Sequence, residues 1–163
     1  MTIFALVVIA LLIGLLVFVK PTPSNVYRKE NPNNIERYIA SLIKSNPHPN
    51  IVTVYEVTDY YIDMEKLTTN CGGYDDAALD AAREHFKSNN IAYLDWTIDN
   101  FGKDNKGVTK VYDFNFSGVM DSTHDAWIAE PWPGRVYIES KIAGCTKPRE
   151  FEEYSFKNKH LWF

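Results

Sequence analysis

Residues 90–102 read N-I-A-Y-L-D-W-T-I-D-N-F-G, and this stretch decides how the rest of the chain is interpreted. It places Asp95 and Asn100 five positions apart, and a second acidic stretch, V-Y-D-F-N, then adds Asp113. Asp and Asn side chains in tight loops routinely cap turns and hydrogen-bond the backbone. These three side chains therefore either shape their own loops or carry chemistry.

The segments ahead of this stretch predict a helix, a hairpin and a second helix. An apolar stripe behind an Asn cap predicts a helix from Asn33 that ends at the prolines of S-N-P-H-P-N. Residues 51–57 and 60–67 follow as two strands separated by a tight link. After T-N-C-G-G, Asp75 can cap a helix that runs to about Lys87.

The segments after it predict a second hairpin and then an irregular region. The turn-rich K-D-N-K-G joins short strands near D-N-F-G and T-K-V-Y-D-F. Beyond Gly118, residues 135–140 and 150–156 could each form a strand or a helix.

Composition limits the classes of function. The 163 residues suit one domain, and the net charge of −4 with a pI near 5.5 argues against nucleic acid as a partner. Cys71 and Cys145 stand at no metal-like spacing, and the four histidines are scattered. A zinc site is not expected.

The N-terminal residues predict a membrane anchor. Residues 3–19 form an uninterrupted apolar run, near the lower limit for crossing a bilayer, without the basic start or cleavage site of a signal peptide. A buried core helix is the alternative, although soluble helices nearly always keep a polar face. The domains expected are an anchor over 1–20, a linker over 21–32 and a globular domain over 33–163. Positive charge on the C-terminal side of the run predicts a single-pass protein whose domain faces the cytosol.

In order and spacing, these landmarks resemble eukaryotic-type protein kinases. The family has a helix leading into an H-P-N-I-V stretch, found here at residues 48–52, then two strands, a long helix and a catalytic loop H-R-D-x-x-x-x-N. Asp95 and Asn100 match the Asp and the Asn of that loop, and Asp113 matches the first residue of the D-F-G motif. The resemblance covers about residues 33–118. It implies that Asp95 accepts the hydroxyl proton, while Asn100 and Asp113 hold Mg²⁺ of a bound Mg·ATP.

The chain departs from the family wherever a nucleotide is held. No G-x-G-x-x-G precedes the first helix, and too few residues lie there for the strands that cover ATP. Lys29 lies in N-V-Y-R-K-E-N, which does not resemble the family's lysine-bearing strand. Register from H-P-N places Ile39 where the partner glutamate should lie, with Glu36 one turn earlier, so no Lys–Glu ion pair is expected.

The catalytic loop also lacks its cations. Tyr93 and Leu94 replace the family's His and Arg, and Thr97 replaces the lysine two positions after Asp95. Each lost electrostatic contact costs several kcal/mol of transition-state stabilisation, so about three losses reduce turnover by many orders of magnitude. Asp95 is therefore expected to be vestigial, with no cofactor, and Mg·ATP is the alternative.

The fold class expected is α+β: a truncated protein-kinase-like domain, built as helix, hairpin, helix and catalytic-loop hairpin, behind a transmembrane helix. The function expected is that of an inactive kinase-like structural protein. Similarity to small kinase-derived proteins of large DNA viruses suggests a minor capsid protein, anchored by residues 3–19, that bridges a virion inner membrane and capsid proteins. The alternatives are a Ser/Thr protein kinase with full or residual ATP binding, and a decoy that binds a host kinase or its substrate.

Overall fold

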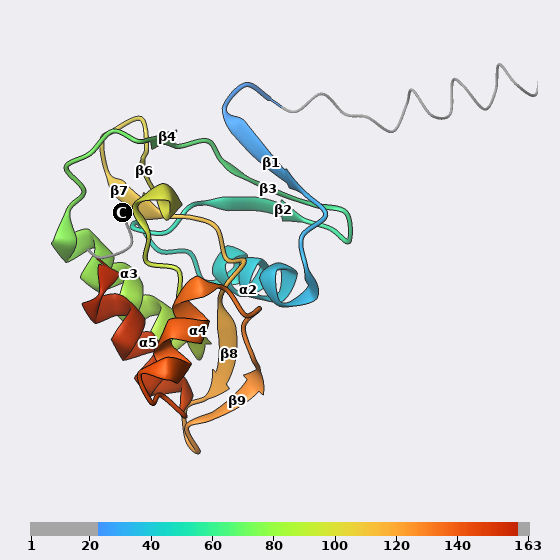
Figure 1. Ribbon diagram of the computed structural model, residues 1–163. Helices are drawn as coiled ribbons and strands as arrows, with labels where there is room; N and C mark the ends of the chain where they lie inside the picture. The colour runs from blue at the N-terminus through green and yellow to red at the C-terminus, as the bar shows by residue number, and fades with distance from the viewer. Residues whose placement is uncertain (1–22, 160–163) are drawn as a thin grey trace, which may run out of the picture.

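The computed structural model describes residues 23–159, which form three small antiparallel sheets and the helices around them (Figure 1). The order along the chain is β1 (Val26–Glu30), α2 (Asn34–Ser45), β2 (Val54–Val57), β3 (Tyr61–Glu65), β4 (Thr68–Thr69), α3 (Asp76–Ser88), β5 (Ile91–Ala92), the 3₁₀ turn η1 (Ile98–Asn100), β6 (Phe101–Lys103), β7 (Thr109–Val111), β8 (Gly118–Asp121), β9 (Ala126–Ala129), α4 (Arg135–Ile142) and α5 (Pro148–Lys157).

The first sheet has the order β1–β3–β2, and α2 packs against it (Figure 1). The predicted helix begins where expected, because the Asn33 side chain accepts a hydrogen bond from the Glu36 amide at 2.9 Å. Ile39 and Ile43 on its apolar stripe are buried. The predicted hairpin is also confirmed, as β2 and β3.

The remaining elements surround an aromatic core. The predicted second helix is confirmed as α3, with Asp75 accepting from the Ala77 amide at 2.9 Å. The ring of Phe86 on α3 stacks on Tyr93 with centroids 4.9 Å apart, and Trp96 meets Phe156 of α5 edge-on at 4.8 Å. The second predicted hairpin is confirmed as β6 and β7. Both segments left open beyond Gly118 are helices, α4 and α5.

The prediction missed β1. Residues 26–30 lie in the predicted linker, but they pair antiparallel with β3 from Val26 opposite Glu65 to Glu30 opposite Tyr61. Arg28 on this strand forms a bidentate ion pair with its cross-strand neighbour Asp63, at 2.6 and 2.7 Å. This strand places Lys29 inside the domain.

The predicted membrane helix requires correction. Residues 3–19 lie outside the described range, and between residues 23 and 159 no helix has the length and apolar character needed to cross a bilayer. Residues 23–159 form a mixed α/β domain, and the predicted transmembrane element is not among their helices. A single-pass membrane location is not supported.

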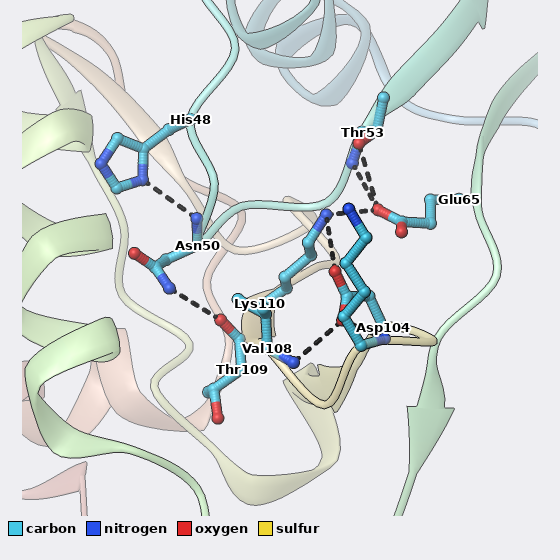
Figure 2. A network of polar contacts seen from close by, with 9 residues as sticks. His48, Asn50, Thr53, Glu65, Asp104, Val108, Thr109 and Lys110 are labelled. Carbon is cyan, nitrogen blue, oxygen red and sulfur yellow. Dashed lines mark hydrogen bonds and ion pairs between the residues drawn. The ribbon is translucent and has the colours of Figure 1, made fainter.

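Lys110 braces the first sheet against the β6–β7 hairpin (Figure 2). Its Nζ lies 2.6 Å from Glu65 Oε2 at the end of β3 and 3.8 Å from Asp104 Oδ2 in the hairpin turn. The side chain of Lys110 is only 9% exposed. Close by, the Asn50 side chain donates to the Thr109 carbonyl at 3.1 Å. This bond ties the segment ahead of β2 to β7 next to Lys110.

Replacing Lys110 should weaken this brace. We expect Lys110→Met to lower the free energy of unfolding by about 2–4 kcal/mol, because it leaves Glu65 and Asp104 facing each other without a cation. Lys106→Met, at an exposed position in the same hairpin turn, is the matched control and should stay within about 0.5 kcal/mol of wild type. Urea unfolding of both variants measures the difference, and equal effects would contradict a bracing role.

Candidate functional site

Lys29 meets two carboxylates that come from different elements. Its Nζ lies 2.5 Å from Glu36 Oε1 on α2 and 2.6 Å from Asp113 Oδ1, just after β7. Alternation along β1 explains the direction of the side chain, because Arg28 is committed to Asp63 and the next residue must point to the opposite face. The expectation that Lys29 and Glu36 form no ion pair is therefore wrong.

Burial controls the charge of this cluster. Glu36 is 1% exposed, and desolvation raises its pKa, although Lys29 opposes the shift. Apart from that ion pair, neither carboxylate oxygen of Glu36 has a well-aligned hydrogen-bond partner among residues 23–159. Desolvation by itself would lower the pKa of Lys29, but Asp113 and Glu36 outweigh it and raise that pKa. The cation is thus held between the two acids.

Asp95 and Asn100 lie together in the predicted catalytic loop. The Asn100 side-chain nitrogen donates to the Asp95 carbonyl at 3.0 Å, and the Tyr112 amide donates to the Asn100 carbonyl at 2.9 Å. Burial raises the pKa of Asp95, the hydrogen bond from Asn100 lowers it, and the nearby charge of Asp113 raises it further. The fold therefore brings all three predicted site residues into one electrostatic environment, with Lys29 added.

Asp113 occupies a backbone conformation that few residues adopt. Its φ is 65°, in the left-handed region where Asp and Asn are the commonest residues after Gly. Its Oδ1 accepts the Asn115 amide at 3.0 Å in addition to Lys29. The side chain thus shapes its own turn and also faces the site, so the structural and the chemical interpretation both apply to it.

The positions of the missing loop cations are filled by core residues. Tyr93 and Leu94, which replace the family's His and Arg, are 0% and 1% exposed. The Tyr93 hydroxyl donates to the Tyr112 carbonyl at 3.2 Å, and its own carbonyl accepts from the Trp96 indole at 2.9 Å. Tyr93 and Leu94 pack in the core beneath the loop that holds Asp95, and they supply no charge to the site.

A cavity of about 230 Å³ lies between the first and second sheets, and neither Lys29 nor Asp113 is among the residues that line it. Tyr27, two residues before Lys29, and Tyr112, immediately before Asp113, both line it. The other lining residues come from the end of β3 and the segment after it: Met64, Glu65, Lys66, Leu67 and Thr69. The cavity therefore lies where the first sheet meets the second, and its walls are mainly apolar.

The side chains present suit a magnesium–nucleotide ligand in part. Mg²⁺ prefers one or two carboxylates together with phosphate oxygens and water. Asp113 supplies a carboxylate, and Asn100 has its amide oxygen to offer because its nitrogen is committed to Asp95. Over residues 23–159 no group of three or more His, Cys, Asp or Glu could hold a metal alone, so phosphate oxygens would have to complete the shell. When bound, Mg²⁺ would neutralise phosphate charge.

The residues of the candidate site that the sequence did not identify are Lys29 and Glu36. The signal for Lys29 was the short run V-Y-R-K, which is compatible with a strand but carries no clear alternation of apolar and polar residues. The sequence register places Ile39, not Glu36, at the position of the partner glutamate. In the structure, Glu36, one turn earlier on α2, is the residue that faces Lys29.

Similarity to known proteins is found among solved structures. No family model and no curated protein matches the chain. One similar solved structure is the crystal structure of the yeast RNA Pol II CTD kinase CTDK-1 complex, with TM-score 0.45 and 22% identity. The match covers 62% of this chain and 41% of the chain in that structure. This chain thus spans about two fifths of the length of the kinase-complex chain.

That similarity is distant, and a TM-score of 0.45 does not by itself establish a shared fold. The comparison offers no support for a viral origin, which stays a prediction.

Replacing Glu36 should change how stability depends on pH. Because the folded pKa of Glu36 is raised above the unfolded value of about 4.3, its contribution to stability is full below that value and is lost as pH rises through the folded pKa. We expect the free energy of unfolding of wild type, minus that of Glu36→Gln, to fall as pH rises. Urea titrations from about pH 4 to pH 8 measure this difference, and parallel curves would contradict it.

Proposed function

We propose that this chain is a kinase-like domain that binds a magnesium–nucleotide, transfers phosphoryl groups poorly, and acts mainly by contact with partner proteins. The observation that supports nucleotide binding is the position of Lys29 between Glu36 and Asp113. A lysine held this way is oriented before any ligand arrives, so little side-chain entropy remains to be lost when it contacts phosphate.

The cavity between the two sheets supports the same proposal. A nucleotide combines a flat, largely apolar base with a charged phosphate chain, and the cavity has mainly apolar walls that include Tyr27, two residues before Lys29. Tyr27 and Lys29 are neighbours on one face of β1, which aligns the two halves of the site. This revises the expectation of no cofactor in favour of its alternative, Mg·ATP.

Poor transfer follows from the catalytic loop. Phosphoryl transfer relies on cations that stabilise charge on the phosphoryl oxygens. Lys29 is a cation that the sequence did not predict there, but Tyr93 and Leu94 are committed to the core, and Thr97 is uncharged. The low turnover expected from the sequence stays a prediction, and Lys29 would add one cation that the sequence did not place in the site.

The partners remain those expected from the sequence. Contact with capsid or other structural proteins stays a prediction, and so does the absence of nucleic acid as a partner. The alternative of a kinase-like decoy also stays a prediction.

Nucleotide binding can be measured directly. With the full chain, we expect Mg·ATP at about 100 times its dissociation constant to stabilise the fold by about 2.7 kcal/mol, seen as a rise in melting temperature. Lys29→Met should weaken binding about tenfold or more, because it removes a charged contact to phosphate. Lys44→Met, on the exposed side of α2, is the matched control and should bind like wild type.

Two outcomes would count against nucleotide binding at this site. One is the absence of any ATP-dependent shift in wild type. The other is equal ATP affinity in Lys29→Met and wild type, with circular dichroism showing that the variant is folded. Lys29→Arg keeps the charge and should retain more affinity than the methionine variant.

Phosphoryl transfer has its own test. We expect wild type and Asp95→Asn to release or transfer radiolabelled γ-phosphate at the same rate, within background, because the loop lacks the cations that support the transition state. Asp95→Asn keeps the shape of the side chain but removes its negative charge and its capacity to accept a proton. Transfer by wild type that the Asp95 variant abolishes would show that the domain is a working kinase.

A further inference from the structure

We propose that two copies of this chain associate through the exposed face of α4, about a two-fold axis that sets the two helices antiparallel. This inference goes beyond the proposed function, because it names a second copy of the chain as a partner and does not depend on nucleotide binding. The observation behind it is an apolar ridge on α4 that carries one pair of opposite charges.

One face of α4 packs on the domain, and the opposite face carries exposed isoleucines. The buried residues of the helix are Val136, Tyr137 and Ser140, and α4 lies against α5 (Figure 1). Ile138 is 50% exposed and Ile142 is 82% exposed. Because residues four apart on a helix are neighbours, the two isoleucines form one continuous ridge. Contiguous exposed apolar surface marks contact sites, whereas scattered exposed apolar residues are ordinary.

Trp132 adds a third exposed apolar side chain at the start of the helix. It lies two residues before the N-cap residue Gly134 and is 68% exposed. Trp is one of the residue types most enriched among the side chains that dominate binding energy at interfaces. Exposed apolar side chains therefore stand at both ends of α4, at Trp132 and Ile142, and near its middle, at Ile138.

The charges on this face determine the direction of the second helix. Arg135, Ile138, Glu139 and Ile142 stand at positions i, i+3, i+4 and i+7, so all four share one face. Within one copy, Arg135 Nε lies 2.8 Å from Glu139 Oε1. A two-fold axis at right angles to the helix, level with Tyr137, brings Arg135 of each copy beside Glu139 of the other. Each charge then meets a partner of opposite sign.

The same axis brings the apolar side chains together. With a rise of 1.5 Å per residue, the Ile138 side chains of the two copies lie about 3 Å apart along the helix direction. Trp132 of one copy comes near the level of Ile142 of the other. An axis level with Ser140 would instead pack Ile138 on Ile142, but it would also set the two Glu139 carboxylates face to face. Like charges repel across such a contact, so the charges select the first register.

The contact is small, because α4 has only eight residues. Interfaces below about 1,200 Å² are typical of weak and transient association. A two-fold contact uses the same patch on both copies, so one substitution removes two interactions. We therefore expect a dimer that forms at high protein concentration and responds strongly to single changes.

Exchanging charges between copies tests the register. Sedimentation equilibrium of the full chain at concentrations up to about 1 mM should show reversible dimers. We expect Arg135→Glu and Glu139→Arg each to raise the dimer dissociation constant about tenfold or more, because each sets like charges face to face. An equimolar mixture of these two variants should associate at least as strongly as wild type, since opposite charges then meet again. Circular dichroism checks that each variant is folded.

The apolar ridge has its own matched control. Ile142→Glu should raise the dimer dissociation constant about tenfold or more, because it places a charge at both ends of the contact. Ile128→Glu makes the same change on β9, where the side chain is 68% exposed, and should dimerise like wild type. All variants keep residues 1–22, so association through that segment would be common to all of them.

Three results would overturn this inference. The first is a wild type that stays monomeric at about 1 mM. The second is a mixture of the two charge variants that stays monomeric, which would limit Arg135 and Glu139 to a pair within one helix. The third is an equal effect of Ile142→Glu and Ile128→Glu. ATP binding is measured separately through Lys29, so this inference and the proposed function fail independently.

Discussion

The ion pairs of Lys29 join β1, α2 and the segment after β7. Lys29 lies on the edge strand of the first sheet, Glu36 on the helix that packs against that sheet, and Asp113 on the segment after β7. One ammonium group thus connects three elements of the fold. Its position also keeps the buried carboxylate of Glu36 from being an uncompensated charge, which would cost several kcal/mol.

Much of the scaffold could be predicted from the sequence because its signals are local. Asn33 and Asp75 accept hydrogen bonds at the starts of their helices, and a cap of this kind is visible in a single residue type followed by an apolar stripe. The hairpins were visible for a similar reason, since K-D-N-K-G is a turn by composition. The relation of Asp95 to Asn100 was also readable, because one loop contains both.

The errors concern contacts that only tertiary structure creates. Residues 26–30 become a strand because β3 provides a partner across 35 residues, as the pairing of Arg28 with Asp63 shows. Nothing in V-Y-R-K-E itself requires this, so Lys29 could not be placed in the site from its neighbours. The position of Glu36 depends on how α2 sits on the sheet, and a shift of one turn exchanges it with Ile39. Sequence spacing alone does not fix that rotation.

The charge of the site determines the form in which an anion can enter it. Lys29 pairs with the carboxylates of Glu36 and Asp113, and the carboxylate of Asp95 lies within range of its charge; burial raises the pKa values of Glu36 and Asp95. A free polyphosphate would meet more negative than positive charge and would be repelled. A divalent cation bound with the phosphates would reverse that balance, and under the proposed function Asp113 and the amide oxygen of Asn100 would hold it. If the proposed function holds, the acidic residues would favour entry of the metal complex over the bare anion.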